Sequence, residues 1–297
     1  MVLRFSVAAA LFIGFTVSLP IKPSNAQQPA AAKPSSTSQA AQNTGQPGES
    51  ANALVKTTVQ NELKAIDNDH THWMYLTHTR KNGAMITEQI VETPHGNLTR
   101  IIARNGHPLS TEEQKQEDIK VEKFVNDTDA QQKQRQDLHN DAKKTQSLLA
   151  MLPDALTYTY AGRVGANTKL TFKPNPDFHP PSREAKVFAA MEGQMVINTR
   201  EHRLVGFSGH LSKPVKFGGG LLGDLDAGGT FDVHQQEVGP GHWEISLLKV
   251  NIKGRALLFK TISEQQYERD TTFKRIPDDL TMAQAYDLAK KQNIPTT

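Results

Sequence analysis

The sequence predicts an α+β fold in which a strongly curved antiparallel β-sheet, an open half-barrel, packs against an N-terminal amphipathic helix and a helical insert. Three observations lead to this prediction. About ten short runs rich in β-branched and aromatic residues are joined by connections too short for helical crossovers, which favours antiparallel pairing. An apolar stripe at helical spacing precedes these runs. A highly charged stretch at about residues 110–152 interrupts them.

The N-terminus has the features of a secretory signal peptide over residues 1–26. Arg4 supplies the positive charge, and Phe5–Leu19 is an uncharged apolar run shorter than the roughly 20 residues needed to span a bilayer. Ser24 and Ala26 place small residues at the two positions that a signal peptidase reads, so we expect cleavage after Ala26. The protein is therefore predicted to act in the periplasm or as a secreted protein. An uncleaved membrane anchor is the alternative.

Composition divides the rest of the chain into a linker and one domain. The composition of residues 27–50 predicts a disordered linker, because the segment consists mainly of Gln, Ala, Pro, Ser and Thr, which offer little apolar surface to bury. Residues 51–293 are long enough for a single β-rich domain with its own core. The sequence has no cysteine, which excludes disulfide bonds. Cleavage would remove two of the 34 basic residues and none of the 31 acidic ones. The remaining chain would have a net charge of +1, which does not provide the basic surface that nucleic-acid binding requires.

The first elements of the domain are a helix and a β-meander. Asn52–Ile66 places five apolar residues on one helical stripe, which predicts an amphipathic helix lying on a sheet. Turn residues at 81–83 and 94–96 separate the three strands that follow. We expect these strands at Trp73–Thr79, Ala84–Glu92 and Leu98–Arg104.

The charged insert predicts two helices. Ser110 and Glu113 have the spacing of a capping box at its start. The segment Ser110–Ala142 has a weak apolar stripe and should pack lightly, whereas the apolar group Leu148, Leu149, Met151 and Leu152 should be buried.

The second half of the domain is again rich in strands and ends in a short helix over Thr281–Lys291. An extended stretch through Phe273 comes before that helix. The expected strands are Leu156–Ala161, Lys169–Lys173, Lys186–Asn198, Arg203–Leu211, Thr230–Glu237, Trp243–Asn251 and Ala256–Ser263.

One hairpin carries a resemblance to a known family. Met191–Asn198 runs through a tight turn into His202–Phe207, with an amphipathic helix ahead of the sheet. This arrangement resembles the LolA/LolB superfamily of periplasmic lipoprotein carriers. The resemblance implies a half-closed barrel over helices and a cavity that binds acyl chains. The expected partners are therefore lipid or lipoprotein acyl chains, with peripheral contact to a membrane and no nucleic acid. No cofactor is expected, and the oligomeric state stays open.

The glycine-rich stretch Phe217–Gly229 is the most unusual segment of the sequence. It lacks the Lys-Ser/Thr of a phosphate-binding loop, and a long hairpin connection is its plainest interpretation. Our functional hypothesis is a mobile flap at the mouth of the cavity, because loops carried by a rigid sheet often hold binding residues. The predicted ligand-binding residues are Phe217, Leu221 and Leu222.

Catalytic and metal-binding patterns are weak. His70 and His72 would share a face of an extended segment and are the best candidates for metal ligands, but no third ligand is fixed by spacing. No nucleophile elbow, His-Glu-x-x-His pair or cysteine nucleophile is present. We therefore expect a non-catalytic envelope protein that binds lipid or acyl chains. An envelope hydrolase and a scaffold or interaction protein without a small ligand are the two alternatives.

Overall fold

The computed structural model describes residues 49–81, 83–220, 222–256 and 260–291. The expected signal peptide and nearly all of the expected linker lie outside these ranges. Within them, thirteen strands form one antiparallel sheet whose outermost strands, β4 and β5, are not paired with each other. The predicted α+β class with a large antiparallel sheet is confirmed.

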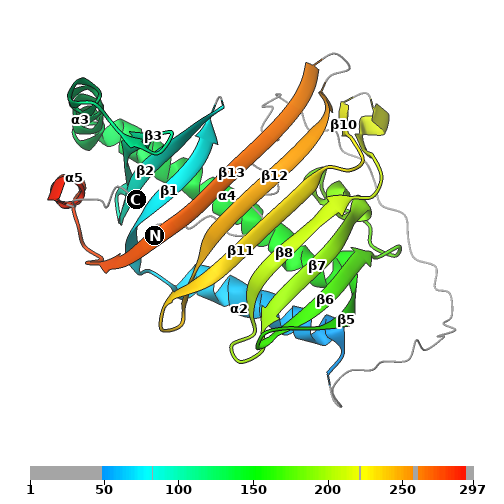
Figure 1. The fold of residues 1–297 in the computed structure, drawn as a ribbon. Helices are drawn as coiled ribbons and strands as arrows, with labels where there is room; N and C mark the ends of the chain where they lie inside the picture. Colours follow the sequence, from blue (N-terminus) through cyan, green and yellow to red (C-terminus); the bar gives the residue numbers. More distant parts are fainter. Residues whose placement is uncertain (1–48, 82, 221, 257–259, 292–297) are drawn as a thin grey trace, which may run out of the picture.

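The sheet consists of two groups of strands joined through the last strand of the chain. Its order is β4-β3-β2-β1-β13-β12-β11-β8-β7-β6-β5, with β10 attached to β12 and β9 to β10 (Figure 1). The strands are β1 (His72–Lys81), β2 (Ala84–Thr93), β3 (Gly96–Arg104), β4 (His107–Pro108), β5 (Leu156–Val164), β6 (Asn167–Pro174), β7 (Met191–Asn198), β8 (Arg203–Leu211), β9 (Val215–Phe217), β10 (Gly223–Leu225), β11 (Thr230–Gly239), β12 (His242–Ala256) and β13 (Lys260–Ile276).

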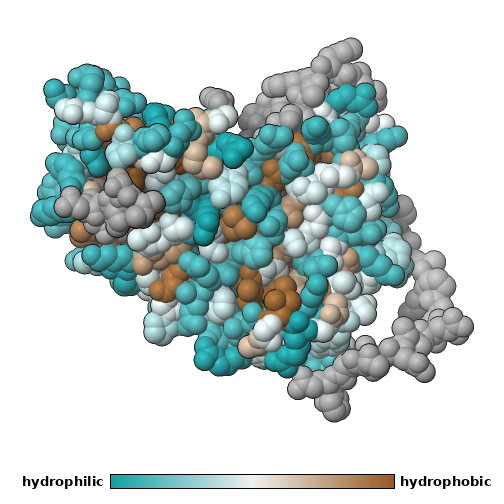
Figure 2. Space-filling model, in the orientation of Figure 1, coloured by the Kyte–Doolittle hydropathy of each residue, from teal (hydrophilic) through white to brown (hydrophobic). Residues whose placement is uncertain are grey.

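Helices α2 (Ala51–Asn68) and α4 (Thr128–Ala155) lie behind the sheet in the view of Figure 1. Helices α3 (Thr111–Val125) and α5 (Met282–Lys291) lie at the end formed by β1, β2 and β3. The face of the sheet turned toward the viewer carries mostly hydrophilic side chains with scattered hydrophobic ones (Figure 2). The large apolar core combines residues of α2 and α4 with residues of β5–β8, β11 and β12.

The structure differs from the predicted strands in two places. The first half of Lys186–Asn198 is the 3₁₀ helix η2 (Glu184–Ala190), because its buried residues lack the two-residue alternation of a strand. The expected strand Ala256–Ser263 does not exist as a separate element. Strand β12 instead continues to Ala256, and β13 begins at Lys260. These are the two longest strands of the sheet, with 15 and 17 residues.

Helix α2 begins where the sequence pattern places it. The Ser50 hydroxyl accepts a hydrogen bond from the Ala53 amide at 3.2 Å and caps the first turn. The stripe residues Leu54, Val55 and Val59 are buried in the large core. Burial of such a face, rather than helix propensity, supplies most of the stability of a helix in a folded protein.

Three stacked aromatic rings fill the centre of the large core. Phe172 stacks on Phe207 with ring centroids 4.8 Å apart, and Phe207 contacts Phe231 at 5.3 Å. Two glycines provide the space for these rings. Gly193 and Gly209 pair across β7 and β8, and a Cβ atom on Gly209 would come within 2.8 Å of the Phe231 ring.

The helical insert forms the two predicted helices. Ser110 and Glu113 make the predicted capping box, with the Ser110 amide donating to the Glu113 carboxylate at 2.9 Å. Near the start of α4, the Gln134 side chain hydrogen-bonds both main-chain groups of Asn97 in β3. Near its end, Leu148, Leu149 and Leu152 are buried in the large core, as predicted, whereas Met151 is only partly buried. Helix α4 therefore contacts strands at both ends of the sheet.

A buried ion pair fixes α2 to β8. The Glu62 carboxylate accepts two hydrogen bonds from the Arg203 guanidinium, at 2.9 and 3.0 Å, and a third from the Leu204 amide at 2.7 Å. Glu62 is 4% exposed, and the guanidinium also lies over the Trp243 ring at 5.8 Å. Three donors on one buried carboxylate compensate much of its lost hydration.

We predict that Glu62→Ala lowers the free energy of unfolding by about 3–5 kcal/mol, because it leaves a buried guanidinium without its partner. Glu62→Gln should cost less, since the amide oxygen can still accept from the Leu204 amide. Urea denaturation followed by circular dichroism measures both. The control is Asp137→Ala, which breaks the exposed pair with Lys133 and should cost less than about 1 kcal/mol. Equal losses for Glu62→Ala and Asp137→Ala would show that the buried pair does not stabilise the fold.

Candidate functional site

A group of acidic side chains lies where β13 joins the two groups of strands. We call Glu88, Glu92, Glu244, Glu268 and Asp270 the carboxyl cluster; Glu88, Glu92, Glu244 and Asp270 are buried, and Glu268 is partly buried. Carboxylates with this degree of burial are unusual in a folded protein unless they are paired or bind something. The cluster is therefore the strongest candidate site in the described part of the chain.

Strand register places Asp270 and Glu268 of the cluster on one face of the sheet. Thr77 in β1 lies opposite Asp270 in β13, and Thr79 lies opposite Glu268. Glu268 in turn lies opposite Leu248, which belongs to the large apolar core. Since directly opposed residues share a face, Asp270 and Glu268 lie on the face of the sheet that α2 and α4 cover.

Asp270 is the most perturbed acid of the cluster. Burial and the neighbouring Glu268 raise its pKa to about 8, although a hydrogen bond from the Thr77 hydroxyl at 2.7 Å opposes this shift. The pKa of Glu268 is raised as well, first by burial and then by Glu88, while Lys81 acts in the opposite direction. At neutral pH, Asp270 is therefore mostly protonated.

An aromatic pair borders the cluster. Tyr75 stacks on Phe273 with ring centroids 5.1 Å apart. Burial raises the pKa of the Tyr75 hydroxyl well above its usual value, and Glu92 and three other acids of the cluster add to that shift. The Tyr75 hydroxyl is therefore buried within electrostatic range of four carboxyl groups of the cluster.

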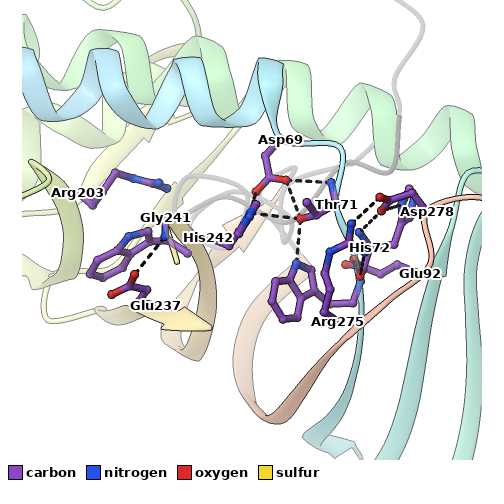
Figure 3. A network of polar contacts seen from close by, with 12 residues as sticks. Asp69, Thr71, His72, Glu92, Arg203, Glu237, Gly241, His242, Arg275 and Asp278 are labelled. Atoms are coloured by element: carbon purple, nitrogen blue, oxygen red, sulfur yellow. Dashed lines mark hydrogen bonds and ion pairs between the residues drawn. The ribbon is translucent and has the colours of Figure 1, made fainter. Parts of the chain in front are cut away.

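A second polar network lies at the junction of α2 and β1 (Figure 3). The Asp69 carboxylate accepts hydrogen bonds from the Thr71 amide and hydroxyl, at 2.9 and 2.7 Å, and lies 2.9 Å from His242 Nδ1. The Thr71 hydroxyl is 3.4 Å from the same His242 nitrogen. A hydrolytic triad needs the acid and the hydroxyl on opposite ring nitrogens. This geometry gives no support to the hydrolase alternative.

The two candidate metal ligands, His70 and His72, lie in different environments. His70 is exposed, whereas His72 is buried with its Nδ1 atom 3.0 Å from Asp278 (Figure 3). Hydrogen bonds from Arg275, and to a lesser extent from His72, lower the pKa of Asp278 to about 2. Within the described residues, no group of three acidic or histidine side chains could hold a metal ion.

The glycine-rich segment is a short β9–β10 hairpin at one margin of the sheet. Phe217 is 3% exposed and packs in the large core, while Leu222 is 40% exposed with its side chain against Gly218. Leu221 lies outside the described residues. Of the three predicted ligand-binding residues, Leu222 is thus the one seen at the surface.

A pocket of about 330 Å³ lies between β3, α3 and α4, away from the glycine-rich segment. Its apolar lining comes from Val121, Phe124 and Ala130, and the exposed Lys120 and Lys123 border it. This volume is at the lower end of the range typical of small-molecule sites. The pocket lies in the insert, where the sequence suggested only light packing.

Sequence reasoning did not identify the carboxyl cluster. A signal was present in Glu268-Arg269-Asp270, where acids two residues apart in a strand must share a face. To use that signal, the register between β13 and β1 must be known, and these two strands are nearly two hundred residues apart in the sequence.

Comparison with protein-family models, with curated proteins and with solved structures finds no match to this chain. The resemblance to the LolA/LolB superfamily thus stays a prediction. Of the helices in the described ranges, none combines the length and apolarity needed to traverse a lipid bilayer.

The raised pKa of Asp270 predicts that the protein loses stability as pH rises. The folded protein holds this proton up to about pH 8, whereas the unfolded chain releases it near pH 4, so Asp270 contributes a slope of about −1.4 kcal/mol per pH unit in between. Asp270→Asn removes the titrating group. The slope of the unfolding free energy against pH should therefore become less negative by the contribution of about one proton.

Urea denaturation at about pH 5, 6.5 and 8 measures this slope. The matched control is Asp287→Asn, which neutralises an exposed carboxylate on α5 and should leave the slope as in the wild type. If Asp270→Asn and the wild type lose stability in parallel over this range, Asp270 is not the buried titrating group.

Proposed function

We propose that this protein binds acyl chains or lipids in the cell envelope without catalysing a reaction. The pocket between β3, α3 and α4 is the observation that carries the proposal. Its lining is mostly apolar, as a hydrocarbon chain requires, and each methylene group buried there would contribute about 0.8 kcal/mol. Lys123 is placed to pair with the carboxylate or phosphate of an amphiphile, whereas Lys120 is already paired with Glu117 at 3.1 Å.

The fold is compatible with this role. In our proposal the open sheet is a strongly curved half-barrel, and α2 together with the insert closes one of its faces. The partners would be lipid or lipoprotein acyl chains, with peripheral contact to a membrane. The exposed Leu222 could add to such a contact as part of the glycine-rich flap.

We also propose that residues 1–26 direct export and are then removed. This proposal rests on Arg4, the apolar run Phe5–Leu19 and the small residues at 24 and 26. N-terminal sequencing of protein recovered from the periplasm or the medium should begin at Gln27. Recovery of a chain that begins at Met1 would contradict it.

The pocket predicts uptake of a fluorescent fatty acid of about twelve carbons by the wild-type protein. Ala130→Trp should weaken this binding about tenfold or more, because the indole ring fills the pocket. Ala130 is only partly buried, so circular dichroism should show an unchanged fold.

The double substitution Leu221→Asp and Leu222→Asp separates the pocket from the flap. Binding that survives this change but is lost in Ala130→Trp supports the pocket, and the reverse pattern supports the flap. If the wild type takes up no probe, acyl binding is excluded and the scaffold alternative takes its place.

A further inference from the structure

The carboxyl cluster and the aromatic pair lie together and have no role in the proposed acyl pocket. Tyr75 contributes both to the stack with Phe273 and to the electrostatic environment of Asp270 and Glu268. Aromatic faces and carboxylates share one preference, since both attract a positive charge. Two kinds of cation-attracting group therefore meet where β1 and β13 pair.

A buried hydroxyl points independently to a missing partner at this place. Thr79 is 9% exposed, and within the described part of the chain its hydroxyl has no hydrogen-bond partner. Thr79 lies two residues from Thr77 on the same face of β1 and directly opposite Glu268. A buried hydroxyl without a partner destabilises the folded state, and a bound ligand would remove that cost.

Within the described residues, acidic side chains gather around the site from three strands. β2 contributes Glu88 and Glu92, β12 contributes Glu244, and β13 contributes Glu268 and Asp270. Lys81 of β1 also lies beside them, and it is paired with Glu88 at 3.0 Å. Arg269 lies opposite His78, in the alternate position of β13, and so faces away.

We propose that an organic cation of the alkylammonium class binds between the Tyr75–Phe273 pair and the carboxylates of Asp270 and Glu268. The aromatic faces would contact the alkyl groups around the charged nitrogen, as in sites for quaternary ammonium ligands. Asp270 and Glu268 supply the opposite charge. The Thr79 hydroxyl is available to an amine N–H or to a water molecule that accompanies the ligand.

Binding of this cation is coupled to the loss of a proton. Asp270 is mostly protonated at neutral pH, and only its ionised form pairs with a cation. Affinity should therefore rise with pH, by about tenfold or more between about pH 6 and pH 8. A fatty acid held by a lysine side chain should show no such rise in affinity.

The test is calorimetric titration of the full chain with hexyltrimethylammonium, with hexanol as the neutral analogue. The wild type should bind the ammonium compound and bind hexanol about tenfold more weakly or not at all. Asp270→Asn keeps the shape of the side chain, and it should weaken ammonium binding about tenfold and abolish its pH dependence. Phe273→Leu should weaken binding a few-fold through loss of the ring face.

Asp287→Asn serves again as the matched control, because it removes one negative charge at an exposed position on α5. Its ammonium affinity should equal that of the wild type. The proposal is overturned if the wild type binds no ammonium compound at millimolar concentration, if hexanol binds equally well, or if Asp270→Asn binds like the wild type. Fatty-acid uptake by the same protein is scored separately, so the two proposals can fail independently.

Discussion

The pairing of β1 with β13 is the constraint on which the rest of the structure depends. The three strands β1–β3 come early in the chain, and the sheet that follows α4 is complete only when the last strand returns to lie between them and β12. One end of β13 pairs with β12 and the other with β1, and the two registers overlap near Glu268 and Arg269. Such pairing between distant segments forms late and slowly, because the loop entropy must be overcome first. The two groups of strands therefore form one sheet only through β13.

The same strand explains why polar groups occur in the middle of the sheet. On β12, the residues facing α2 and α4 are apolar, as in Leu248 and Val250. On β13, the residues opposite them are Glu268 and Gln266. The apolar core thus ends at a sharp border between two adjacent strands. A protein that needed only stability would continue the apolar face across this border, since buried carboxylates cost free energy that packed aliphatic residues do not.

Local sequence patterns were sufficient for most elements and insufficient for the site. The helical stripe of α2, the capping box of α3 and the leucines of α4 are each encoded within a few residues, and all three were predicted. The extent of β12 and β13 was not, because Gly254 and the polar alternation of residues 264–268 interrupt the usual strand signal. The 3₁₀ helix η2 was taken for a strand because Val187 and Phe188 have high strand propensity. The carboxyl cluster depends on register, which no local pattern contains.

Helix α4 gives the domain a mechanical property. A helix is stiff along its axis, and the stretch from Gln134 to Ala155 spans about 30 Å between the contact with β3 and the contact with β5. Helix α4 therefore fixes the distance between the two margins of the sheet. A change in the curvature of the sheet therefore requires one end of α4 to detach from its strand. The leucine-rich end of α4 is buried, whereas the end near β3 is held by hydrogen bonds from Gln134 and Arg135. Detachment of α4 therefore begins at β3.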